Sequence, residues 1–316
     1  MKAAGKSGIE IMNELGENPK AEWEDNVEVV LQGVPIPKGF EYIEGTKDTG
    51  LVVKNSTDNN EFVWVPVPNP NDMYWEYEGQ KVGQIYDYGT GSSPKDPYEK
   101  ILTYDANDGT REPAIITGNL TGDGLLYDGL VTNLAEAGMN TAGLTDGLVA
   151  AEAFKSQLQE EFDEMAESVE KYKGFYVGRY ETTGTVMLPT VQKGKTVLAS
   201  TTWYQHYKIL KDMYKLNGNV ASGMIWGCQY DQIMLWMQDI DNPHVEGAKY
   251  ITNSTGMGNH TVASGGTGVP GSSGSSENYR VKNIYDLAGN LWDMTLEARG
   301  TNNSRGFRRW LLREYW

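Results

Sequence analysis

GFYVGRYETT occupies residues 174–183, and it is the stretch from which the fold of this 316-residue chain can be worked out. It begins with aromatic and β-branched residues between two glycines, which is typical of a short β-strand. The residues before it, 151–173, have the clearest helical pattern in the chain. Apolar residues recur there every three or four positions and share one helix face: Phe154, Leu158, Phe162, Met165, Val169 and Tyr172. Gly174 stands where a glycine commonly ends a helix, so we predict a helix followed at once by a strand.

Two more helices and a turn are predicted downstream. Residues 203–214 read as a helix whose N-cap is Ser200, Thr201 or Thr202. Residues 227–237 read as a third helix, with these side chains on one side: Tyr230, Ile233, Met234 and Met237. In NIYDLAGNLWDMTLEA, residues 283–298, Gly289 and Asn290 both tolerate positive φ and predict a tight turn.

Together these segments resemble the formylglycine-generating enzyme or sulfatase-modifying factor family. The resemblance covers residues 174–298, and EFVWVPV at 61–67 resembles the opening strand of that family. It implies an α+β fold, the irregular C-type-lectin-like or sulfatase-modifying-factor fold, with few helices and short antiparallel strands. The same scaffold carries non-catalytic variable proteins that retroelements diversify, and these are the nearest in kind to this chain.

The predicted domain organisation follows from composition and breaks. Residues 1–33 are polar, with a weakly helical look at 23–31, and the Pro- and Gly-rich break at 33–39 predicts that the folded body begins there. One domain is then expected over 34–316. It contains an insertion at 68–150, a flexible Gly/Ser loop at 253–278 and an atypical, shortened C-terminus at 299–316.

The charge of the chain excludes several classes of function. The formal net charge is −16, which argues against a nucleic-acid partner and disfavours an anionic membrane surface. Residues 1–180 contain 14 Lys or Arg and 32 Asp or Glu, whereas residues 181–316 contain 13 and 11. No apolar run is long enough for a membrane span, and no secretory signal is recognised. A cytoplasmic location is therefore the default expectation, with a cell surface or phage particle as the alternative.

The cysteine count separates this chain from the enzymes that it resembles. Those enzymes oxidise a substrate cysteine with a copper ion held by two cysteines, but Cys228 is the only cysteine here. One thiolate cannot provide the site that Cu(I) prefers, so neither copper nor catalytic residues are expected. The three histidines, His206, His244 and His260, show no ligand spacing.

The resemblance also indicates where a ligand and a cation would bind. The variable relatives place their binding residues in the last strands, so the expected contacts with a protein or carbohydrate ligand are Arg305, Arg308, Arg309, Trp310, Tyr315 and Trp316. Some family members carry calcium near the AGN turn, which implies Asn290 and Asp293 as Ca²⁺ ligands. The alternative for Asn290 is a turn held by its own side chain.

Two readings of the C-terminus stay open. In the first, Arg305-Gly306-Phe307-Arg308 replaces the terminal Gly-Phe-Arg strand of the family. In the second, the coding frame has slipped, since residues 309–315 read one base later can give an Arg-Gly-Gly strand. The expected function is a non-enzymatic ligand-binding protein. The alternatives are an oxidase of the sulfatase-modifying type and a structural surface or phage component with the helix at 151–173 as its assembly element.

Overall fold

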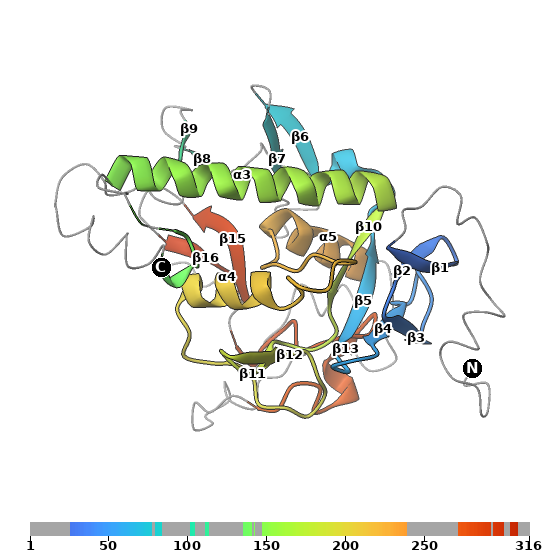
Figure 1. Cartoon of the computed structure of the whole chain (residues 1–316). Helices are drawn as coiled ribbons and strands as arrows, with labels where there is room; N and C mark the ends of the chain where they lie inside the picture. The colour runs from blue at the N-terminus through green and yellow to red at the C-terminus, as the bar shows by residue number, and fades with distance from the viewer. Residues whose placement is uncertain are drawn as a thin grey trace.

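The computed structural model describes residues 26–77, 80–83, 102–104, 111–113, 135–140, 142, 147–238, 271–291, 293–299 and 304–308. Within these residues the protein is a mixed α+β structure (Figure 1) with three α-helices and short antiparallel sheets. The helices are α3 (Gly147–Tyr172), α4 (Trp203–Asp212) and α5 (Gly227–Gln238). None of the helices described is long and apolar enough to cross a membrane.

A four-stranded antiparallel sheet with the order β10-β5-β4-β3 is the largest sheet among the described residues. Its strands are β3 (Phe40–Glu44), β4 (Val52–Asn55), β5 (Glu61–Pro66) and β10 (Gly174–Gly178). The remaining strands pair two by two: β1 (Val27–Leu31) with β2 (Val34–Pro37), β6 (Tyr74–Tyr77) with β7 (Gln80–Gly83), β8 (Leu102–Tyr104) with β9 (Arg111–Pro113), β11 (Thr183–Thr185) with β12 (Leu188–Thr190), β13 (Arg280–Val281) with β14 (Ile284–Tyr285), and β15 (Asp293–Arg299) with β16 (Ser304–Arg308).

Successive side chains along a strand point to opposite faces of the sheet. Both faces of this four-stranded sheet are covered by other elements. On one face, Val63 and Val65 of β5 pack with Ile233 and Met237 of α5. On the other, Trp64 packs with the β1–β2 hairpin. The β-branched residues of EFVWVP therefore form a strand that is buried on both sides.

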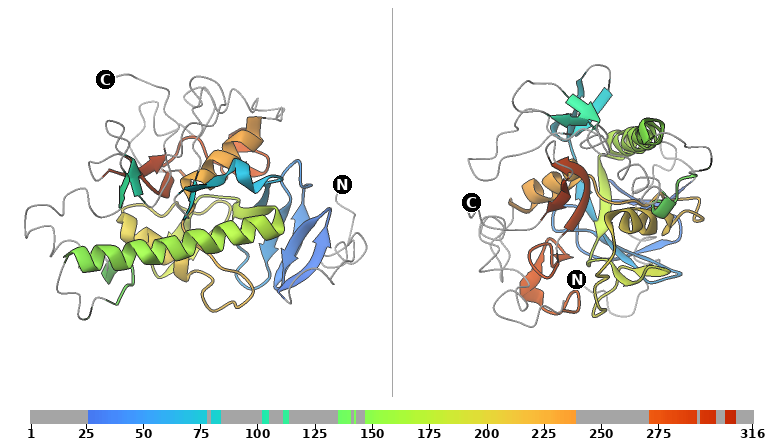
Figure 2. Two further views of the ribbon diagram at one scale, coloured as in Figure 1. Left: turned by 90° about the horizontal axis from the view of Figure 1, so that it is seen from above. Right: turned by 90° about the vertical axis from the view of Figure 1, so that its left-hand side faces the viewer.

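The long helix α3 confirms the predicted helix and its apolar face. Phe154, Leu158 and Phe162 are at most 2% exposed and share a core cluster with Trp203 and Tyr207 of α4. Figure 2 shows α3 running along the outside of the molecule, where its other face carries the acidic residues.

The other two helices also confirm their predictions. Thr202 caps α4, and its hydroxyl and the side chain of Gln205 form a reciprocal capping box. Helix α5 buries Tyr230, Ile233 and Met234.

Two local expectations are wrong. Residues 27–31 form strand β1 rather than helix, because the β-branched run VEVVL pairs with VPIP of β2. Residues 273 and 274, near the end of the predicted flexible loop, are packed: both are buried, and the Ser273 amide donates to Lys195 O over 3.0 Å. Residues 1–25 and 253–270 lie outside the described residues.

Parts of the predicted insertion contribute to the core. The described pieces of 68–150 include a 3₁₀ turn, η1 (Pro70–Asp72), and the strands β6 to β9. Met73 is fully buried, Ala137 is 4% exposed, and both belong to the cluster around α3.

Candidate ligand-binding site

The last described strand carries the two expected ligand contacts that the structure places. Arg305 and Arg308 are on β16, opposite Ala298 and Asp293 of β15. Residues 293–299 and 304–308 therefore form an antiparallel pair of strands. The other expected contacts, Arg309, Trp310, Tyr315 and Trp316, lie outside the described residues, so the structure brings only these two together on one strand.

The inner strand of this hairpin is tied to the core. Leu296 is 2% exposed, and its amide donates to Ile225 O over 2.9 Å. The indole of Trp203 donates to Thr295 O, also over 2.9 Å. Both residues lie between Met294 and Ala298, where the register of β15 with β16 is interrupted. Strand β15 is thereby joined to α4 and to the segment before α5.

The turn before β15 has the backbone that the sequence predicts. Gly289 has φ 93° and Asn290 has φ 54°. The side-chain oxygen of Asn290 accepts from the Gly271 amide over 2.8 Å, and its amide group donates to Glu181 over 2.5 Å. Asn290 thus holds the turn in place, as the alternative interpretation of this residue expects.

A second acidic side chain fixes the same region. Asp286 is 1% exposed and accepts from the Ser273 hydroxyl over 2.9 Å and the Gly274 amide over 2.6 Å. These bonds explain why residues 273 and 274 are packed rather than flexible. Sequence composition cannot reveal them, because Asp286 lies beyond the Gly/Ser stretch.

Carboxyl groups that are partly withdrawn from solvent surround this turn. Burial and the nearby Asp286 raise the pKa of Asp293 to about 8, although the Tyr230 hydroxyl donates to it over 3.3 Å. Burial, followed by repulsion from Asp286, raises the pKa of Glu181 well above its usual range. At neutral pH Asp293 is therefore mostly protonated.

This protonation state bears on the expected calcium ligands. A cation would have to displace the proton of Asp293 and compete with Gly271 for the oxygen of Asn290. Among the residues that the structure describes, no three His, Cys, Asp or Glu side chains are close enough to hold a metal ion. Both side chains are thus engaged in hydrogen bonds within the chain.

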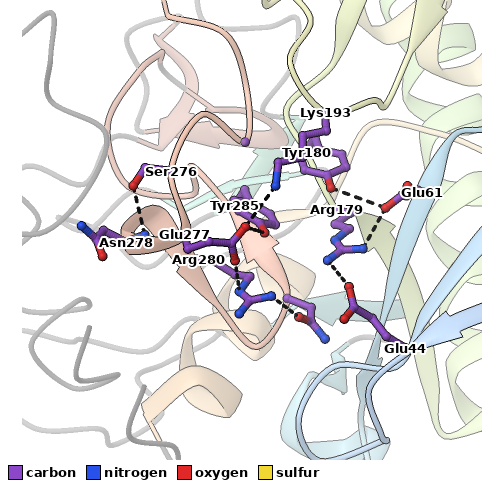
Figure 3. A network of polar contacts seen from close by, with 12 residues as sticks. Glu44, Glu61, Arg179, Tyr180, Lys193, Ser276, Glu277, Asn278, Arg280 and Tyr285 are labelled. Atoms are coloured by element: carbon purple, nitrogen blue, oxygen red, sulfur yellow. Dashed lines mark hydrogen bonds and ion pairs between the residues drawn. The ribbon is translucent and has the colours of Figure 1, made fainter. Parts of the chain in front are cut away.

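Arg179 organises a polar network that the sequence did not single out (Figure 3). It is 5% exposed and forms ion pairs with Glu61 at 2.8 Å and with Glu44. Its guanidinium group lies over the rings of Tyr180 and Tyr285, which stack with their centroids 5.1 Å apart. The motif GRYE thus contributes a buried cation and one member of an aromatic pair.

The outer half of this network is centred on Glu277. It accepts from the Tyr285 hydroxyl over 2.7 Å and from Lys193 over 3.0 Å, and it pairs with Arg280 at 3.1 Å. Lys193 and Arg280 also lie over the Tyr285 ring. Three cations and three carboxylates balance one another, so the network holds distant segments of the chain together and does not favour a charged ligand.

The remaining candidates for chemistry are buried or partly buried. Cys228 is fully buried in the apolar cluster around α3. Burial also lowers the pKa of His206 on α4 to about 4, which keeps its imidazole neutral at pH 7. His244 and His260 lie outside the described residues. Comparisons of the chain with protein-family models, with curated proteins and with solved structures find no match.

Proposed function

We propose that this protein is a non-enzymatic ligand-binding protein in which the C-terminal hairpin and the residues after it contact the ligand. The observation that carries the proposal is that the two strands of the hairpin differ in their contacts. Strand β15 is tied to the core through Leu296 and Thr295, whereas β16 carries two of the expected contacts, Arg305 and Arg308. A binding surface needs contact residues held on a rigid frame, and β16 beside the fixed strand β15 provides that arrangement.

The scaffold is proposed to be C-type-lectin-like. What supports this is the antiparallel sheet flanked by helices, with long irregular connections and a terminal hairpin, in the order that the resemblance implies. The retroelement-diversified variable proteins use such a scaffold for binding, which is the model for the function proposed here.

The ligand is proposed to be a protein or carbohydrate that carries carboxylate or sulfate groups. Arg305, Arg308 and Arg309 supply guanidinium groups, which pair with such anions in a two-pronged geometry. Trp310, Tyr315 and Trp316 supply flat aromatic surfaces with a polar edge, which suit sugar rings and peptide groups.

Calcium binding near Asn290 and Asp293 remains a separate proposal. If it occurs, the carboxyl group of Asp293 gives up its proton to become a cation ligand, so affinity rises with pH. Melting the protein in calcium and in a chelator tests this. An increase in Tm with calcium that Asp293→Asn abolishes supports the site, whereas equal Tm values in both buffers contradict it.

The two alternatives have less support. An oxidase of the sulfatase-modifying type needs accessible paired thiolates, and Cys228 is single and buried. An assembly role for α3 needs a free apolar face, and Phe154, Leu158 and Phe162 are already buried within their own chain.

A glycan array that includes sulfated and carboxylated glycans tests the binding proposal. We expect the wild-type protein to bind acidic probes and the Arg305→Ala/Arg308→Ala variant to lose that binding without a change in Tm. Lys47→Ala/Lys215→Ala, at exposed positions in the β3–β4 loop and after α4, is the charge-matched control and is expected to bind as the wild type does. Equal binding by the double variant contradicts the assignment of the site.

A further inference from the structure

The tip of the β11–β12 hairpin exposes three consecutive apolar residues. Thr185 pairs with Leu188, so Val186 and Met187 form a two-residue loop. Val186 is 50%, Met187 88% and Leu188 71% exposed. Among the described residues, Leu216 is the other large hydrophobic side chain with such exposure. Continuous apolar runs of this kind on a surface usually mark a contact site.

The fold does not require apolar residues at this tip. Two-residue hairpin loops favour Asn-Gly or Asp-Gly, and nothing in the turn geometry demands Val-Met. The turn is closed by the Leu188 amide, which donates to the Thr185 hydroxyl over 3.1 Å. The exposed side chains themselves therefore contribute little to folding. Their exposure indicates that they contact another molecule.

The base of the hairpin is rigid. Thr183 is fully buried, and its hydroxyl donates to Thr190 O over 3.1 Å. The hairpin therefore presents its tip as a fixed projection rather than as a loop that can fold its apolar groups away.

The charge around the hairpin differs from that of the whole chain. No Asp or Glu occurs between Glu181 and Asp212, and Lys193 and Lys195 follow the hairpin directly. Both lysines are exposed, and Lys193 also pairs with Glu277. The segment that carries the hairpin is therefore not acidic, in contrast to the chain as a whole with its net charge of −16.

The acidic helix lies on the opposite side of the molecule. Figures 1 and 2 show α3, α4 and the β11–β12 hairpin following one another across the structure, so that α4 separates the other two. The exposed acids of α3 are Glu160, Glu164, Glu167 and Glu170. A helix is about 10 Å thick and the Debye length at physiological salt is about 8 Å, so these charges are largely screened at the hairpin.

We propose that the β11–β12 hairpin inserts Val186, Met187 and Leu188 into the surface of an anionic lipid bilayer, with Lys195 at the level of the phosphates. Aliphatic side chains dissolve among acyl chains, and lysines beside them pair with headgroups. Protein hot spots are instead rich in Trp, Tyr and Arg, which the tip lacks. A tip-to-tip contact between two copies would fall well below the roughly 1,200 Å² that a stable interface buries.

Vesicle flotation with the full chain tests this proposal. The probes are vesicles of phosphatidylcholine alone and of phosphatidylcholine with phosphatidylglycerol. We expect the wild-type protein to float with the mixed vesicles and less with the neutral ones. Met187→Asp is expected to lower the bound fraction about tenfold or more. The matched control is Leu216→Asp, since Leu216 is 97% exposed on another loop, and it is expected to float as the wild type does.

Three outcomes overturn the proposal: no flotation of the wild-type protein, equal flotation with both kinds of vesicle, or an equal loss of flotation in the Leu216→Asp variant. If flotation is absent, sedimentation velocity can also show a dimer that Met187→Asp dissociates. Such a dimer would assign the tip to a contact with a second copy of the chain. Thermal melts of both variants check that each is folded, since solvent-exposed substitutions are expected to leave Tm nearly unchanged.

Discussion

Gly174 is required by the fold, but not as the residue that ends α3. The residue that ends α3 in the left-handed region is Lys173, with φ 59°, and its amide donates to Val169 O over 2.8 Å. Gly174 is instead the first residue of β10, where a Cβ would lie 2.3 Å from Trp64 Cζ2 and 2.5 Å from Val65 O. Glycine is required there because two strands and an indole ring approach closely.

Gly174→Ala is therefore expected to destabilise the protein by about 3 kcal/mol, since the clash is with a buried ring and with backbone. Urea denaturation measures the change. Gly223→Ala is the control, because a Cβ at Gly223 meets nothing within 4 Å and its φ is not positive. Gly223→Ala is expected to be neutral or slightly stabilising, because alanine lowers the entropy of the unfolded chain. A similar loss in both variants would contradict the assignment of the effect to the close approach at Gly174.

Arg179 gives a second prediction at the residue scale. Arg179→Met keeps an unbranched apolar stem and removes the charge between Glu44 and Glu61, so we expect a loss of about 2 kcal/mol in the free energy of unfolding. The loss is moderated because the Glu44 side chain is 47% exposed and stays hydrated. Lys193→Met, at a side chain that is 52% exposed, is expected to change stability by less than about 0.5 kcal/mol. An unchanged free energy of unfolding in Arg179→Met would show that this network does not stabilise the fold.

The helices are the elements that the sequence predicts best. The period of the apolar residues identifies α3, α4 and α5 and their buried faces, because that period is a local property of the chain. The structure begins α3 at Gly147 rather than at Ala151. The sequence of β1 looks weakly helical because five residues carry too little pattern to outweigh a flanking polar stretch, whereas its pairing with β2 decides its state.

Leu158 tests the packing of α3. Leu158→Ala is expected to cost about 3 kcal/mol, because the side chain is fully buried between α3 and α4 and leaves a cavity. Glu164→Ala, on the exposed face of the same helix, is expected to be neutral or slightly stabilising, since it removes repulsion from Glu160 and Glu167. A small effect of Leu158→Ala in urea denaturation would contradict the assigned orientation of α3.

His206 on α4 predicts a pH dependence. Its pKa is about 4 in the folded protein and about 6.5 in the unfolded chain, because burial disfavours the charged form. Between these values the unfolded chain binds a proton that the folded protein does not bind, so stability is complete above pH 6.5 and falls as the pH approaches 4. We expect a loss of about 1–2 kcal/mol between pH 7 and pH 5 that His206→Gln reduces. Equal pH profiles for both proteins would show that the imidazole is hydrated.

At the scale of the whole molecule, the sequence predicts the mixed α+β class but not the contacts between distant segments. The Arg179 network joins residues from five parts of the chain, and the bonds of Asp286 fix residues 273 and 274. Such contacts depend on tertiary proximity, which periodicity and composition do not contain. Of the expected site residues, Arg305 and Arg308 are placed on one strand, and Asn290 proves to hold a turn.

The central claim is that this chain uses its scaffold to bind and not to oxidise. It rests on a single cysteine that is buried in an apolar cluster, beside a terminal hairpin whose inner strand is fixed to the core.

Oxygen consumption by the Cu(I)-treated protein with a cysteine-containing peptide tests this claim most directly, with the metal content after dialysis measured in the same sample. We predict no peptide-dependent oxygen consumption and no stoichiometric copper. Turnover of the peptide by protein that retains one copper ion per chain would contradict the account.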